Sequence, residues 1–176
     1  MYNIEHFEKE IPTCEYVDNY VEISVFLEYC MECRNYKKVW SCPEFDFDVM
    51  SYWNGYSTLR VVAKKINFEE GTTPEEGMEI MKEVKDNLSE ELWELEEKYP
   101  GSISLSGGSC YLCGEGNCSR PEGKPCRYPE KMRYSIEALG GNVGLTVRKL
   151  MGIQLEWIEE GKLPSYFVLI GGLLMK

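Results

Sequence analysis

Cysteine is the residue that most constrains this chain, because seven of its eight cysteines fall in two short stretches. The first stretch has the spacing C-x2-C-x8-C, and the second has C-x2-C-x4-C-x7-C. A C-x2-C step lets two thiolates turn back onto one metal ion or cluster, and the further cysteines complete the ligand shell from the adjoining loop. Buried free thiols are the alternative explanation, but it does not account for the grouping. We therefore predict metal binding by the first set (Cys30, Cys33 and Cys42) and by the second set (Cys110, Cys113, Cys118 and Cys126).

Disulfide bonding is the other common use of clustered cysteines, and it belongs mainly to small secreted domains. The first ten residues of the chain lack the basic and apolar regions of a secretory signal. The longest apolar stretch, Tyr166–Met175, is shorter than the roughly 20 residues that a membrane-spanning helix needs. We therefore expect a soluble, cytoplasmic protein without a membrane partner, whose thiols stay reduced.

The charge balance argues against a nucleic-acid partner. The chain carries 30 acidic and 19 basic residues, for a net charge of −11, whereas non-specific binding to DNA or RNA depends on neutralising phosphates. A length of 176 residues with 43% hydrophobic residues suits one globular domain. We expect a single metal-binding domain over residues 1–176.

The clearest predicted element is a helix over residues 74–98. Thr73 is an N-cap residue, Pro74 stands at the first helical position and Glu76 completes a capping box. Apolar residues then recur at three- and four-residue steps, as in an amphipathic helix: Met81, Val84, Leu88, Leu92, Leu95 and Tyr99.

The remaining elements are shorter. The patterns predict strands over 20–29, 57–68 and 102–106, helices over about 46–53 and 129–139, and a helix capped by Asn142 that ends at Gly152. Residues 153–158 and 166–175 resemble a closing hairpin. The N-terminus, with His6, is expected to be mobile. The fold class is α+β, with one sheet covered by the long helix and two cysteine-rich metal-binding loops that follow strands.

Other catalytic constellations are weak. His6 is the only histidine, which argues against histidine-based nucleophilic catalysis. Enzyme activity stays open, since no residue is singled out as catalytic. The stretch 120–133 is locally basic. Its cations can offset the negative charge of a thiolate-bound metal group, so Arg127 and Arg133 are candidate cofactor-binding residues. An anion or acidic-partner site beside the metal is the alternative.

Two motifs resemble those of a known family. They are Cys30-Met-Glu-Cys33 with Trp40-Ser-Cys42-Pro43, and Cys110-Tyr-Leu-Cys113 with Cys118 and Pro125-Cys126-Arg127. They are similar to a domain-of-unknown-function family of cysteine-rich, predicted metal-binding proteins of prokaryotes, over about residues 20–170. This resemblance implies a metal-binding domain with iron–sulfur clusters and no established reaction.

The residues favour iron–sulfur over zinc. Four cysteines in one loop, with prolines beside Cys42 and Cys126, suit one or two [4Fe-4S] clusters. We therefore expect a redox or electron-transfer protein with a redox partner protein, or an accessory to a metalloenzyme. The alternative is a zinc-organised interaction module without chemistry of its own. Its zinc ligands would be Cys30, Cys33, Cys110 and Cys113.

The first set supplies only three thiols, so its fourth ligand has to come from elsewhere. The candidates are Cys14, His6, Asp46, a cysteine of the second set or an exchangeable ligand. We favour a ligand other than Cys14, because a predicted strand separates Cys14 from Cys30. An open fourth position is how metal sites admit substrates. The identity of this ligand therefore separates an electron carrier from an enzyme.

Overall fold

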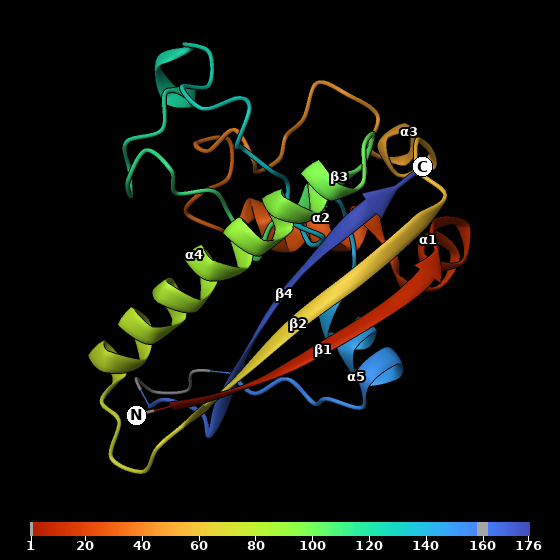
Figure 1. Cartoon of the computed structure of the whole chain (residues 1–176). Helices are drawn as coiled ribbons and strands as arrows, with labels where there is room; N and C mark the ends of the chain where they lie inside the picture. The colour runs from red at the N-terminus through yellow and green to blue at the C-terminus, as the bar shows by residue number, and fades with distance from the viewer. Residues whose placement is uncertain (1, 158–161) are drawn as a thin grey trace.

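The computed structural model describes residues 2–157 and 162–176, and its centre is a four-stranded antiparallel sheet in the order β1–β2–β4–β3 (Figure 1). The strands are β1 (Tyr2–Pro12), β2 (Thr58–Phe68), β3 (Ile103–Leu105) and β4 (Tyr166–Met175). The helices are α1 (Thr13–Tyr20), α2 (Ile23–Met31), α3 (Val49–Asn54), α4 (Pro74–Lys98) and α5 (Val143–Met151), with a short 3-10 turn, η1 (Arg120–Glu122). The α+β class with one sheet and a long helix is confirmed.

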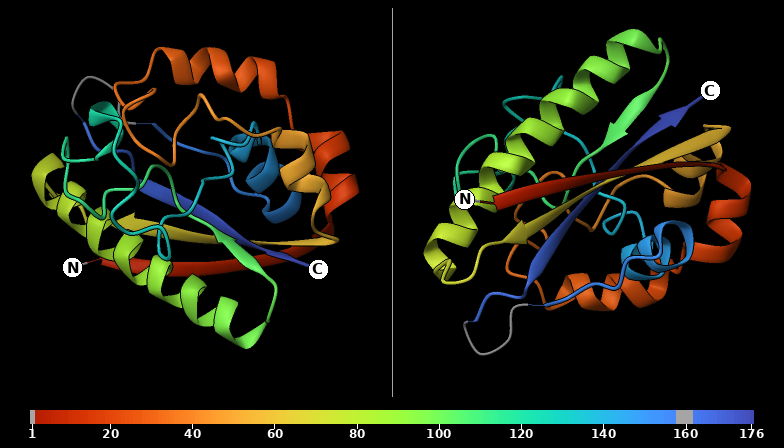
Figure 2. Two further views of the ribbon diagram at one scale, coloured as in Figure 1. Left: turned by 90° about the horizontal axis from the view of Figure 1, so that it is seen from above. Right: turned by 60° about the horizontal axis from the view of Figure 1, so that its bottom comes forward.

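Both faces of the sheet are covered, because the inner strands are apolar on both sides. In β2, Leu59, Val61 and Ala63 join the main core, whereas Val62 and Ile66 face α4. Figure 2 shows α4 on one side of the sheet and the other helices on the opposite side. β4 is accordingly a continuous stretch of apolar residues and glycines, whereas β2 mixes its apolar residues with Arg60, Lys64 and Lys65.

Helix α4 has the predicted bounds and the predicted cap. The Thr73 hydroxyl accepts a hydrogen bond from the Glu76 backbone N–H, and the Glu76 carboxylate accepts one from the Thr73 N–H. Its buried residues Met81, Val84, Leu88 and Leu92 form the predicted stripe and pack on the sheet. Glu96, near the end of α4, accepts a hydrogen bond from the backbone N–H of Ser104 in β3, which ties the helix to the edge of the sheet.

Two glycines in β4 permit close packing on both faces of the sheet. A Cβ atom at Gly171 would lie 2.7 Å from the Leu105 carbonyl oxygen and 2.9 Å from Leu92 Cδ1. A Cβ atom at Gly172 would lie 2.8 Å from the Arg60 carbonyl oxygen on the opposite side. The central strand therefore has no room for side chains where α4 and the neighbouring strands approach it.

The strand predicted over 20–29 is wrong, because these residues begin α2 after a single bridge between Val21 and Gly141. Ile23, Phe26, Leu27 and Cys30 are the half-buried positions of this helix, and their spacing of i, i+3, i+4 and i+7 is helical. The first cysteine loop therefore follows a helix.

The helix predicted over 129–139 is also wrong. This segment consists of turns, with a bridge between Ser106 and Ser135, although Ile136 and Leu139 are buried as expected. A hairpin was predicted between residues 153–158 and 166–175. Residues 166–175 instead form β4, which pairs with β2 on one side and with β3 on the other. Residues 152–157 are irregular, and residue 158 lies outside the described residues.

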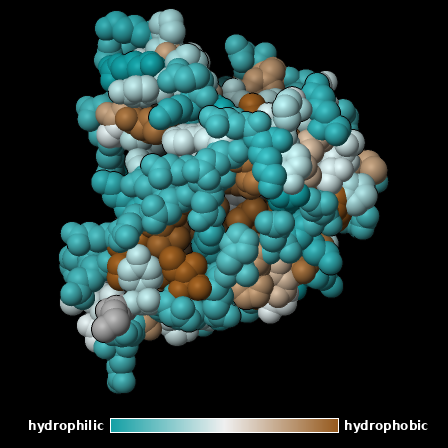
Figure 3. All heavy atoms as spheres, viewed as in Figure 1, coloured by the Kyte–Doolittle hydropathy of each residue, from teal (hydrophilic) through white to brown (hydrophobic). Residues whose placement is uncertain are grey.

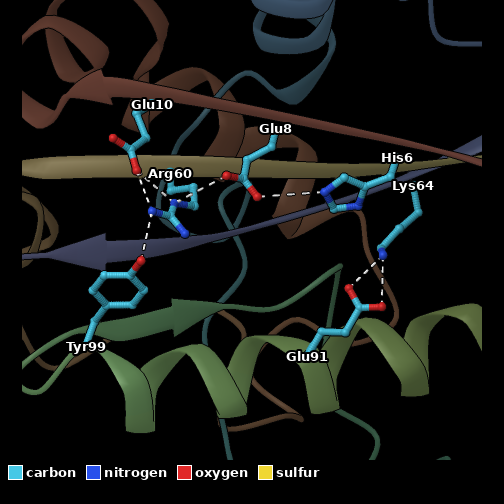
Figure 4. Close-up of polar contacts among 7 residues, drawn as sticks. All are labelled: His6, Glu8, Glu10, Arg60, Lys64, Glu91 and Tyr99. Carbon is cyan, nitrogen blue, oxygen red and sulfur yellow. Dashed lines mark hydrogen bonds and ion pairs between the residues drawn. The ribbon is translucent and has the colours of Figure 1, made fainter.

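Residues 2–12 form an ordered strand, whereas a mobile segment was expected. All eleven residues of β1 pair with β2, and ion pairs across the two strands join Lys65 to Glu5 and Arg60 to Glu10. Figure 4 shows His6 on β1 beside Glu8, with Nε2 and the carboxylate 3.7 Å apart. The ion pairs between β1 and β2, by contrast, are cross-strand pairs, which stabilise a sheet even where a strand lacks the usual apolar alternation.

The surface agrees with the acidic, polar composition. On the face shown in Figure 3, hydrophilic residues dominate and hydrophobic ones are visible mainly in recessed places. Among the residues that the structure describes, no helix is both long and apolar enough to cross a membrane.

We predict that Gly171→Ala destabilises the fold by about 1–3 kcal/mol, the usual cost of forcing extra atoms into a packed core. The new methyl group would collide with the Leu105 carbonyl oxygen and with Leu92. The measurement is chemical unfolding followed by circular dichroism. Gly144→Ala in α5 is the control, because its Cβ would have neighbours only at 3.6 Å, so its stability should stay equal or rise. Equal stability of both variants would contradict the packing argument.

Candidate metal centre

The first cysteine set is delivered by the end of α2 and the loop that follows it. Cys30 lies on the half-buried side of the helix, Cys33 is exposed and Cys42 is half-buried. Burial raises the pKa of the Cys42 thiol to about 11; Ser41 lowers it, and the neighbouring Cys33 and Cys30 thiols raise it. Cys30 and Cys33 therefore interact electrostatically with Cys42.

The second cysteine set lies on the loop after β3. Burial raises the pKa of the Cys110 thiol, a hydrogen bond from the Leu112 backbone lowers it, and the thiols of Cys126, Cys113 and Cys118 raise it. Gly114 and Gly116, both with positive φ, turn the chain between Cys113 and Cys118. The four cysteines therefore share one loop, and their joint role as ligands of one centre stays a prediction.

The two cysteine loops lie side by side and are joined by hydrogen bonds (Figures 1 and 2). The backbone N–H of Cys110 donates to the hydroxyl of buried Ser41 at 2.9 Å. Trp40 Nε1 donates to the hydroxyl of buried Ser119 at 3.3 Å, and Asn35 donates to Ser109 at 3.0 Å. The two cysteine sets, about 70 residues apart in the chain, thus belong to one region of the molecule.

Arg120 is the main link between the loops. Its guanidinium donates to the carbonyl oxygens of Val39, at 2.9 Å, and of Cys42 and Glu44, and it lies over the Trp40 ring. Its charge also lowers the pKa of the Cys42 thiol. A residue of the second loop therefore fixes the backbone around a cysteine of the first.

A cavity of about 1050 Å³ adjoins both loops. All four cysteines of the second set line it, together with residues 34, 35 and 38–40 of the first loop, part of α4 and residues 167–170 of β4. β3 pairs only with residues 172–174 of β4, so the cavity lies against a stretch of β4 that β3 does not cover. Because β3 is short, it leaves room for the cavity that the cysteines of the second set line.

Lys85 of α4 interacts electrostatically with one thiol of each cysteine set. Burial lowers the pKa of its ammonium group, whereas Cys110, Glu137, Asp86 and Cys42 raise it. Its Nζ donates to the Ser109 carbonyl oxygen at 2.6 Å and lies 4.3 Å from the centre of the Tyr111 ring. The chain therefore positions a cation beside thiols of both sets.

Glu137 also lines the cavity, and burial raises the pKa of its carboxyl group. Within the part of the chain that the structure describes, its Oε2 atom is buried and has no hydrogen-bond partner. Sequence reasoning assigned no role to Lys85 or Glu137. Neither has a local signal, because each reaches the cysteines only through the tertiary fold.

The other predicted site residues lie in different surroundings. Arg127 is exposed and donates to the Asn117 carbonyl oxygen, whereas Arg133 forms a bidentate ion pair with Glu96, with both N–O distances 2.6 Å. Cys14 is exposed on α1 and His6 lies on β1, while the Asp46 carboxylate acts on the pKa of Tyr134. A role for Arg127 and Arg133 at the metal stays a prediction.

The residues present fit a thiolate-bound group. All eight cysteines lie in the described part of the chain and are free thiols, and thiolates are the ligands that zinc and iron–sulfur clusters prefer. Among the described residues, no three His, Cys, Asp or Glu side chains are arranged to hold a single metal ion. Metal binding therefore has to draw the thiols closer together, and its free energy would add to the stability of the fold.

We predict that Arg120→Lys loosens the two loops although the charge is kept. Lysine presents its donors from a single nitrogen and cannot reproduce the spread of two guanidinium nitrogens over these carbonyl oxygens, so the protein should lose about 2 kcal/mol of stability. Amide hydrogen exchange in residues 30–45 should accelerate. Arg127→Lys is the matched control, because Arg127 is exposed and donates to one carbonyl oxygen, and it should change stability by less than about 0.5 kcal/mol. Unchanged exchange in Arg120→Lys would refute the linking role.

We predict that Arg133→Gln destabilises the fold by about 3 kcal/mol, because it leaves the partly buried Glu96 carboxylate without its partner. Glu96→Gln should cost a similar amount, and the double variant should cost less than the sum. Metal content is measured on the same samples. A loss of metal in Arg133→Gln that Glu96→Gln does not share would instead support a direct role at the metal.

Comparison with known proteins agrees with this geometry. No curated protein and no solved structure matches the chain. One family model matches residues 17–175, which include both cysteine sets and nearly the whole fold. The chain therefore belongs to the family described as predicted metal-binding protein (DUF2284).

Proposed function

We propose that this protein binds an iron–sulfur cluster through the second cysteine set and acts in electron transfer, either as a carrier or as an accessory to a metalloenzyme. The observation that carries this proposal is the gathering of Cys110, Cys113, Cys118 and Cys126 on one loop, beside a shared cavity. Four thiolates are the usual ligand set of such clusters, and the group would supply one-electron transfer.

The surroundings of the thiols support an electron-transfer role. Lys85 and Arg120 place positive charge near the thiols, which favours the thiolate form and offsets the charge of a thiolate-bound cluster. Exposed apolar side chains flank the cysteines, among them Tyr29, Met31, Leu112 and Tyr128. Exposed aromatic and methionine side chains are enriched at protein interfaces, so this rim suits a redox partner protein.

The test is anaerobic purification of the whole chain, with iron, acid-labile sulfide and zinc measured per chain. We expect a brown protein with iron and sulfide in equal amounts. Cys118→Ala should lose the iron of one centre, whereas Cys14→Ser should keep the wild-type content, because Cys14 is exposed on α1. A colourless protein that holds zinc would refute the proposal and favour a zinc-organised interaction module.

A further inference from the structure

One stretch of α4 borders the cavity beside the cysteine loops. Four residues on one face of the helix, at positions i, i+3, i+4 and i+7, line it: Met78, Met81, Lys82 and Lys85. Tightly packed contacts bound this stretch at both ends. Before it, a Cβ atom at Gly77 would lie 2.4 Å from Leu163 Cδ1, and after it, Leu88 Cδ2 would lie 3.6 Å from a Cβ atom at Gly107. This face of α4 therefore borders the cavity over about 10 Å, at a rise of about 1.5 Å per residue.

Much of the remaining lining is apolar. Phe167 and Leu169 of β4 line the cavity and pack in the same cluster as Met81, while Trp40 and Leu112 come from the two cysteine loops. Ligand sites in proteins are typically concave spaces of roughly 300–1,000 Å³, with mainly apolar walls and a few polar groups that orient the ligand. The cavity of about 1050 Å³ lies close to the upper end of this range. It therefore has room for a small molecule beside a metal group.

The acidic groups of the lining are already engaged or shielded. Glu115 pairs with Arg34, with 2.6 Å between nitrogen and oxygen. The Glu156 carboxylate accepts hydrogen bonds from both the backbone N–H and the hydroxyl of Ser165. Burial raises the pKa of Glu137, which favours its neutral form. None of these carboxylates therefore neutralises the lysines of the lining.

Two of those lysines have no partner. Among the described residues, Lys38 of the first cysteine loop and Lys82 of α4 are exposed and form no ion pair. Lys85 is different, because it donates to the Ser109 carbonyl oxygen and interacts with Cys110, so its charge belongs with the thiols. A chain with a net charge of −11 thus places two unpaired cations, from two separate elements, at an apolar cavity. Clefts lined by charge of one sign attract ligands of the opposite sign.

We propose that this cavity binds a small organic anion, with its apolar body against the methionines of α4 and the side chains of β4, and its anionic group held by Lys38 and Lys82. Methionine side chains are flexible and adapt to ligands of different shapes, so the walls suit a class of compounds. The site goes beyond the proposed function, because its cations and apolar walls do not depend on which metal the thiols bind. All four cysteines of the second set line the same cavity, so the anion would share it with the metal group that they hold.

The experiment measures the binding of two dyes to the whole chain, purified anaerobically, by equilibrium dialysis. Anilinonaphthalene sulfonate has an apolar ring system with one anionic group, and phenylnaphthylamine has the same rings without the charge. We expect one sulfonate dye per chain, bound about tenfold more tightly than the uncharged dye. Added salt should weaken the binding of the sulfonate dye only, because it screens exposed charges.

Variants at exposed positions separate the two parts of the site. Lys38→Gln and Lys82→Gln should each weaken the sulfonate dye about threefold, as expected for an exposed charge pair, and leave the uncharged dye unchanged. Met78→Ala should weaken both dyes about threefold, because it removes part of the apolar wall. Lys149→Gln is the matched control, because Lys149 is exposed on α5 outside the cavity lining, and both dyes should bind to it as to the wild type.

The contrary outcomes are distinct. Absence of dye binding, equal affinity of the wild type for both dyes, or wild-type affinity for the sulfonate dye in a variant that lacks both Lys38 and Lys82 would each overturn the proposal. An equal loss in Lys149→Gln would also overturn it, since binding would then follow net charge alone. These outcomes leave the proposed function standing, because metal content tests that. A zinc protein that binds the sulfonate dye as expected would refute the iron–sulfur role and support the anion site.

Discussion

The hydrogen bonds of Arg120 to the first cysteine loop are the interaction on which the candidate metal region depends. Both loops lack regular structure over most of their length, so few backbone ladders hold them in place. Side-chain hydrogen bonds hold the loops in place of those ladders. The Arg120 guanidinium donates to three carbonyl oxygens, and two buried serines add further hydrogen bonds. A planar group with several fixed donors suits this task, because each bond restricts the same rigid plane.

The parts of the fold that were predictable have strong local signals. α4 carries its capping box and its apolar stripe in contiguous sequence, and β2 carries a run of β-branched residues. The errors occurred where a short segment is decided by its neighbours. Residues 20–29 are rich in strand-forming types, yet Ile23, Phe26 and Leu27 pack on one side of a helix. β1 is charged, and its partner is the row of basic residues on β2, which no reading of β1 alone reveals.

The candidate site was predictable only in part, for the same physical reason. The spacing of cysteines is local information, and the cavity that all four cysteines of the second set line also borders the first loop, which the spacing did not predict. Arg133 was judged from the local charge around it, but its guanidinium is engaged by Glu96, 37 residues earlier in the chain. Lys85 and Glu137 come from a helix and a turn whose sequences contain no cysteine, and only the packing of α4 and the 136–140 turn brings them to the thiols.

The position of β4 has a consequence for the state of the cysteine loops while the chain is being synthesised. β4 follows both cysteine loops in the chain, yet it lies between β2 and β3 and lines the cavity beside them. The chain is synthesised from its N-terminus, and a domain generally folds as a unit. Both sets of thiols therefore leave the ribosome before the strand that completes the cavity beside them. Metal delivered before that moment would meet an open pair of loops, and metal delivered afterwards would meet a packed one.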